Sequence, residues 1–191
     1  MQIIDAVVAF LIGFFAFKGF RLLKDRTLLN LHFSFTLLGV GLLVYGITTR
    51  YFIIRPSRLA ILFSNFGYFI FFITELIAYG LLIFTYLKQT KNITSSMSFI
   101  FPVIIIQYGY IPELIIFFLT AYITCQCAIN YIVRKNINSF LVLIGFALIA
   151  ASHVTFPLVR YSGLSFLVAH TMQLMGFISL LTMLLRVSSN K

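Results

Sequence analysis

Long apolar runs, separated by short stretches rich in lysine and arginine, recur along the whole chain of 191 residues. A helix that rises 1.5 Å per residue needs about 20 apolar residues to cross the ~30 Å hydrocarbon layer of a bilayer. Only 9% of the residues are charged, whereas soluble domains carry about 25%, so too few remain to cover a water-facing surface. The runs therefore predict an all-α, polytopic transmembrane bundle that forms a single domain over residues 1–191.

The boundaries of the apolar runs predict seven transmembrane helices. The long apolar stretch 97–133 is divided in two, because Gly109 and Pro112 interrupt it. Proline in a first helical turn and an acidic residue beside it, here Glu113, both suit a helix start. The expected spans cover residues 3–17, 28–47, 59–87, 97–108, 112–133, 139–159 and 164–186.

The basic residues predict how these helices are oriented. With seven spans, ten of the 14 lysines and arginines fall on the side of the C-terminus, and four fall on the other side. Because short cytoplasmic loops carry the excess of basic residues, we expect the N-terminus outside and the C-terminus in the cytoplasm. The role of the basic residues in orienting the helices also explains the net charge of +10. Membrane lipids are therefore expected partners, whereas nucleic acid is not.

Two histidines in the last two spans are the most suggestive feature for chemistry. His153 lies seven residues before Arg160, and His170 lies seven residues after Gly163. Both therefore lie roughly 10 Å inside the outer boundary of the membrane, on helices joined by a short turn. Gln173 is one turn deeper than His170 on the same face, and Glu113 starts the fifth span at the outer side.

This outer layer suggests a metal or haem site. Neutral imidazole is the commonest metal ligand, and histidine is an ordinary axial ligand of haem. The candidate metal ligands are His153, His170 and Glu113, and the candidate cofactor contacts are His153, His170 and Gln173. Two ligands on adjacent helices fit a single ion more easily than a porphyrin. The alternative is that each histidine forms hydrogen bonds across helices and stabilises the bundle.

Glu75 lies in the middle of the third expected span. An ionised carboxylate at that depth costs several kcal/mol unless it is paired, hydrated or protonated. No lysine or arginine lies at that depth in any span. We therefore expect a neutral Glu75 that bonds to Tyr68, Tyr79 or a helix carbonyl, unless it meets water, an ion or another subunit. It is the second candidate functional position.

The absent motifs narrow the function. The last span has no lysine for a retinal Schiff base, and the chain has no phosphate-binding glycine loop or hydrolase motif. The favoured hypothesis is an integral subunit of a larger membrane complex in a prokaryotic plasma membrane, redox-linked through the metal or haem site. The alternative is a seven-helix sensor or a proton or solute transporter that uses an outer cavity and Glu75. The sequence does not decide whether the protein is an enzyme.

Overall fold

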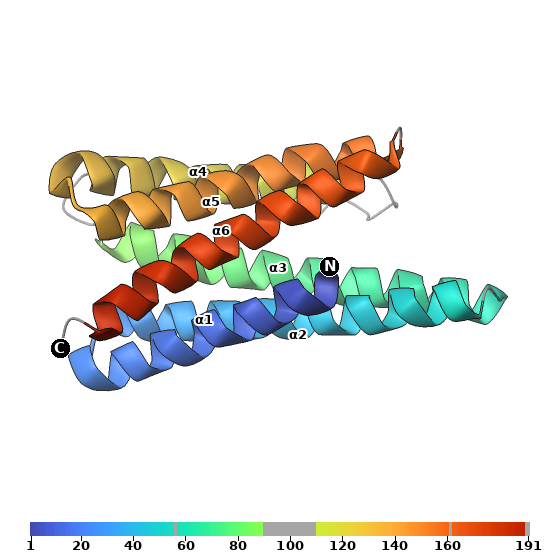
Figure 1. Ribbon diagram of the computed structural model, residues 1–191, viewed down its shortest axis with the longest axis horizontal. Coiled ribbons are helices and arrows are strands. Elements are labelled where there is room, and N and C mark those ends of the chain that lie inside the picture. Colours follow the sequence, from blue (N-terminus) through green and yellow to red (C-terminus); the bar gives the residue numbers. More distant parts are fainter. Residues whose placement is uncertain (56, 90–109, 161, 190–191) are drawn as a thin grey trace.

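A computed structural model describes residues 1–191 except 56, 90–109, 161 and 190–191. The described residues form six α-helices and one short 3₁₀ helix (Figure 1). The elements are α1 (Gln2–Leu23), α2 (Arg26–Ile54), α3 (Arg58–Gln89), α4 (Tyr110–Arg134), α5 (Ile137–Thr155), η1 (Phe156–Arg160) and α6 (Gly163–Ser189). Each α-helix is long and apolar enough to cross a membrane, with a mean hydropathy between 1.6 and 2.0 in its most apolar window.

The predicted all-helical membrane bundle is thus confirmed for these six helices. The span expected over 97–108 lies outside the described residues, so the count of seven and the orientation of the termini stay predictions. The helices extend beyond the expected spans at most ends. For example, α2 covers Arg26–Ile54 instead of 28–47. A helix continues past its apolar core until a capping residue or a turn stops it.

The six helices form a ring in chain order. Each helix packs against its neighbours in sequence, and α1 closes the ring against α6. Two contacts fix the relative direction of α3 and α4: Tyr68 reaches Glu113, and further along both helices Tyr86 reaches Cys127. The two helices therefore run in the same direction, whereas the other neighbours in sequence run antiparallel (Figure 1).

Two similar corners turn the chain at the end of the bundle that carries most of the basic residues. Lys24 and Lys135 adopt left-handed backbone conformations, with φ of 57° and 47°. The next residue caps the following helix: Asp25 accepts from the amide of Thr27 at 2.9 Å, and Asn136 accepts from Ser139 at 2.7 Å. Such caps satisfy amide groups that the first turn of a helix leaves free.

The sixth expected span, 139–159, corresponds to the apolar helix Ile137–Leu158, which changes from α to 3₁₀ geometry near its C-terminal end. The α-helix ends at Thr155, and Phe156–Arg160 continue as a 3₁₀ helix. Pro157 has no amide hydrogen, and its ring obstructs the carbonyl four residues back. That residue is His153, so the break lies directly beside a candidate site residue.

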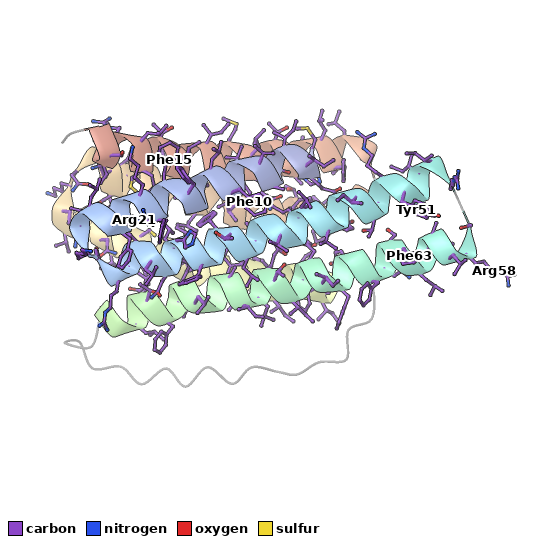
Figure 2. The ribbon with its side chains drawn as sticks, turned by 90° about the horizontal axis from the view of Figure 1, so that it is seen from below. Phe10, Phe15, Arg21, Tyr51, Arg58 and Phe63 are labelled. Atoms are coloured by element: carbon purple, nitrogen blue, oxygen red, sulfur yellow. The ribbon has the colours of Figure 1, made fainter. Side chains whose placement is uncertain are left out.

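The ring consists of two halves, α1–α3 and α4–α6, each closely packed. A Cβ atom on Gly39 would lie 3.1 Å from the ring of Phe10, where α1 meets α2; Figure 2 labels Phe10 on α1. In the other half, a Cβ on Gly176 would lie 2.7 Å from the carbonyl oxygen of Gly145, where α6 meets α5. Small residues allow such close approach in lipid. Among the described residues, every close glycine contact to another helix lies within one half.

The surface of the ring that faces away from its interior is apolar along the helices. Phe84 and Phe118 are 62% and 66% exposed, and Phe14 is 60% exposed. Figure 2 shows side chains projecting outward along the length of the helices, with Arg21 and Arg58 at opposite ends. This surface suits contact with lipid tails. Asp5, Glu75, His153 and His170 are instead buried inside the ring, away from lipid.

Candidate functional site

Most of the acidic residues and histidines of the chain lie inside the ring. The whole sequence has four acidic residues and three histidines. Three of the acids and two of the histidines come together near the end of the bundle opposite the Lys24 and Lys135 corners, across the contacts between the two halves. This end is named the outer end, after the orientation that the sequence predicts. Glu75, His153, Asp5 and His170 are each at most 3% exposed, and the side chain of Glu113 is 16% exposed.

His153, on α5, lies between two carboxyl groups. Its Nδ1 is 2.9 Å from Oε2 of Glu113 on α4, a hydrogen-bond distance. Its Nε2 is 3.7 Å from Oε1 of Glu75 on α3, slightly beyond that range. The Tyr68 hydroxyl, on α3, donates to the other oxygen of Glu113 at 3.3 Å. These contacts bridge α3 to α4 and α5, so they join one half of the ring to the other.

His170, on α6, pairs with Asp5 on α1. Its Nδ1 lies 3.0 Å from Oδ2 of Asp5, and both side chains are almost fully buried. The rings of Phe156 and Phe166 meet the imidazole edge-on, with centroids 5.0 and 4.4 Å away. This pair connects the same two halves where α1 and α6 close the ring.

The structure gives the two histidines different partners. His153 contacts Glu113 and faces Glu75, whereas His170 contacts Asp5. Within the described ranges, no group of three or more histidine, cysteine or carboxylate side chains is arranged to hold a metal ion. The candidate ligand set His153, His170 and Glu113 therefore does not converge on one position in this arrangement.

Gln173 and Glu75 are both buried polar side chains. Gln173 is 1% exposed, and neither its Oε1 nor its Nε2 has a hydrogen-bond partner among the residues that the structure describes. Oε1 of Glu75 faces His153, a neighbour that the sequence analysis did not name for it. The Tyr79 hydroxyl, one turn from Glu75, is also buried without a described partner.

A cavity of about 200 Å³ opens beside this group of side chains, toward the outer ends of the helices. It lies between the two halves and receives residues from α1, α2, α3, α4, η1 and α6. Its lining consists of Gln2, Leu42, Tyr45, Tyr68, Phe71, Glu113, Phe156, Phe166, His170 and Gln173. Glu113 and His170 thus connect the buried carboxyl and imidazole groups to the cavity.

A second cavity, of about 390 Å³, lies at the opposite end of the ring and again between the two halves. Its polar lining includes Thr85, Tyr86, Cys127, Asn130, Arg134 and Asn138. This cavity could not be predicted from the sequence, because its residues come from helices that are distant along the chain. The Tyr86 hydroxyl and the Cys127 sulfur are in contact at 3.2 Å across the halves.

Between the two cavities, the rings of Phe35 on α2 and Phe177 on α6 meet edge-on with centroids 5.8 Å apart, and both side chains are buried. Buried polar side chains also lie along this stretch, namely Ser34 on α2 and Glu75 and Tyr79 on α3. Tyr68 lines the outer cavity and Tyr86 lines the inner one, so a polar stripe on α3 runs from one cavity to the other. The spacing of Tyr68, Glu75, Tyr79 and Tyr86 on one helical face is the sequence signal for it.

His32, the third histidine, lies apart from this site. Its Nδ1 is 2.9 Å from the carbonyl oxygen of Gly13, and its ring lies against Phe17, with centroids 5.0 Å apart. These contacts join α1 to α2 within one half of the ring. His32 is therefore a suitable control residue in tests of His153 and His170, which lie between the halves.

Comparison with known protein families, curated proteins and solved structures finds no match for this chain.

Proposed function

We propose that this protein is a proton-coupled transporter in a prokaryotic plasma membrane. In this proposal a small solute binds in the outer cavity, and Glu75, His153 and Glu113 carry the coupling proton. One observation supports it above the others: a buried carboxyl–imidazole–carboxyl array lies between two cavities that face opposite ends of the bundle. Intramembrane acids and histidines of this kind are typical of proton relays.

The protonation chemistry follows from the two ring nitrogens of His153. A neutral imidazole that donates from Nδ1 to Glu113 presents a lone pair on Nε2 toward Glu75. A protonated Glu75 then passes its proton to Nε2 after a movement that shortens the 3.7 Å separation. The product is an imidazolium between two carboxylates. Glu113, which is partly exposed and lines the outer cavity, connects this step to the outside.

The arrangement of the ring supports alternating access. The close glycine contacts hold each half together, whereas the titratable pairs and both cavities lie between the halves. Many transporters rock one rigid bundle against another around a central site. A change of charge at His153 alters the contacts that join the halves. It thereby favours the opening of one cavity over the opening of the other. A sensor would need only the outer cavity, so the inner cavity favours the transporter.

In this proposal the protein has seven spans with the N-terminus outside, as expected from the sequence. The span predicted over residues 97–108 lies outside the described residues. Because α3 and α4 run in the same direction, the end of α3 and the start of α4 lie at opposite ends of the bundle (Figure 1). The proposed orientation places the basic corners at Lys24 and Lys135 on the cytoplasmic side, as the distribution of basic residues favours.

The redox-linked complex subunit expected from the sequence has less support. His153 and His170 each use Nδ1 to contact a different carboxyl group, on different helices. An absorption spectrum and metal analysis of gently purified protein would test this hypothesis. A visible band or stoichiometric metal that is lost in His170→Ala would favour it over the transporter.

A proton relay that reaches both cavities should also conduct protons slowly when no solute is bound, so proton movement can be tested without knowledge of the solute. Liposomes that contain the protein and an internal pH-sensitive dye receive a potassium diffusion potential, negative inside. We expect proton entry above that of empty liposomes, lost in Glu75→Gln and in His153→Gln, and partly retained in Glu75→Asp, which keeps a titratable group. His32→Gln is the matched control and should behave as wild type. Equal proton entry in wild type and Glu75→Gln would contradict the proposal.

A further inference from the structure

The wall of the outer cavity combines aromatic rings with acidic and amide groups. Five of its ten described lining residues are aromatic: Tyr45, Tyr68, Phe71, Phe156 and Phe166. The Tyr45 ring stacks on Phe71 with centroids 5.5 Å apart and meets Tyr68 edge-on at 5.6 Å. Contacts among these three rings therefore fix how Tyr45, Tyr68 and Phe71 are oriented toward the cavity.

The charge around the cavity is negative. Glu113 lines the cavity, Asp5 and Glu75 lie beside the imidazoles next to it, and no lysine or arginine is among the described lining residues. An ionised Glu113 therefore gives the lining a negative charge that no described basic side chain of the lining balances. In a buried site of low dielectric constant such a charge attracts a cation much more strongly than it would in water.

Gln173 supplies an independent indication of a ligand. Its side chain lines the cavity, is 1% exposed, and has no described hydrogen-bond partner for either its oxygen or its nitrogen. A buried amide without partners costs free energy, and native proteins seldom leave one so. The carbonyl oxygen of Gln173 suits an N–H or O–H donor on a molecule in the cavity.

We propose that the outer cavity binds a small organic cation, an ammonium group that carries apolar substituents. Glu113 is the counter-ion, the aromatic rings contact the substituents and the positive charge, and Gln173 accepts from a donor on the ligand. Cation–π contacts with tyrosine and phenylalanine are a general means of recognising such ions. A bare metal cation fits less well, because Ca²⁺ or Mg²⁺ takes six or more oxygen ligands and half of this wall is aromatic. This inference rests on the proposed function, for which it gives the class of the transported solute.

Equilibrium binding of radiolabelled choline to the protein in nanodiscs, without any gradient, tests the inference. We expect saturable binding that tetramethylammonium competes away and that 3,3-dimethylbutan-1-ol, the neutral analogue of choline, does not. Glu113→Gln should weaken binding by at least about tenfold, and Tyr45→Leu should weaken it by a similar factor. Tyr51→Leu is the matched control, since Tyr51 is 46% exposed near the end of α2 and does not line the cavity.

The outcomes separate this inference from the proposed function. Equal competition by the neutral alcohol, unchanged binding in Glu113→Gln, or no choline binding by wild type would each overturn the organic-cation site. Displacement by sodium or calcium at similar concentrations would assign the cavity to inorganic cations and overturn it as well. If protons enter the liposomes but choline does not bind, the transporter proposal stands without this ligand class. If choline binds but Glu75→Gln leaves proton entry unchanged, the binding site stands without proton coupling.

Discussion

The pair formed by Asp5 and His170 should contribute measurably to the contact between α1 and α6. Both side chains are almost fully buried, and the imidazole nitrogen lies 3.0 Å from the carboxyl oxygen. Replacing His170 with phenylalanine keeps a ring between Phe156 and Phe166 but leaves the Asp5 carboxyl without its described partner. Breaking a buried pair in this way costs about 3–5 kcal/mol in soluble proteins. We expect a smaller loss, about 2–3 kcal/mol, because the isolated carboxyl group can be neutralised by a proton.

A double-mutant cycle isolates the contribution of the pair. We expect Asp5→Ala alone to lower the free energy of unfolding by about 1–3 kcal/mol, since it leaves the imidazole nitrogen buried without an acceptor. The combination Asp5→Ala with His170→Phe removes both polar groups and should be less unstable than the two single effects added, by about 1–3 kcal/mol. Such coupling would exceed the average of ~0.6 kcal/mol found for hydrogen bonds between membrane helices.

The assay is reversible unfolding in mixed micelles of dodecyl sulfate and a mild detergent, followed by far-ultraviolet circular dichroism. Thr182→Val is the control: Thr182 is exposed and bonds only within its own helix, to the carbonyl of Ile178. It should change stability by less than about 0.5 kcal/mol. Additive single effects in the double variant would refute the reasoning, and so would a His170→Phe protein as stable as wild type.

Three further expectations concern packing, capping and the inner cavity. Gly176→Leu should destabilise or prevent the contact of α5 with α6, because even a Cβ there would lie 2.7 Å from the Gly145 carbonyl oxygen; detergent melting curves measure this, and wild-type stability would contradict it. Asn136→Ala should cost about 1 kcal/mol through loss of the α5 cap, whereas Asn136→Ser should retain most of it in the same melts. Asn130 lines the inner cavity and is partly exposed, so the Asn130→Cys variant should react with a small polar thiol reagent added from the inner side, in protein that also carries Cys125→Ser and Cys127→Ser; reaction only from the outer side would contradict the placement of the cavity.

Much of the fold follows from the sequence because the lipid bilayer imposes a simple rule. Apolar runs of sufficient length must be helices, and this reasoning located all six described helices. The helix ends were less predictable. Hydropathy marks where the bilayer stops, whereas α2 continues to Ile54 until its capping geometry ends it. Pro157 signalled the change at the end of α5, but hydropathy alone extended that span to residue 159.

The candidate site was only partly predictable. The short turn between the last two spans predicted a common outer layer for His153 and His170, and the structure places both near the outer cavity. Glu113 was expected in the same layer, but which carboxyl group pairs with which histidine could not be assigned, because the order and rotation of the helices are set by packing across the whole ring. The same limit applied to Glu75, whose proximity to His153 could not be predicted from its position in the middle of a long span.

The closure of the ring by α1 and α6 has a consequence for synthesis of the chain. Asp5 and His170 are separated by 165 positions, so the acid is made long before its partner. At ~5–20 residues per second, the interval is on the order of ten seconds or more. During this time α1 carries an uncompensated carboxyl group in or near the bilayer. Chains that stop before α6 should therefore be recognised and degraded faster than complete ones, and the Asp5→Ala substitution should reduce that difference.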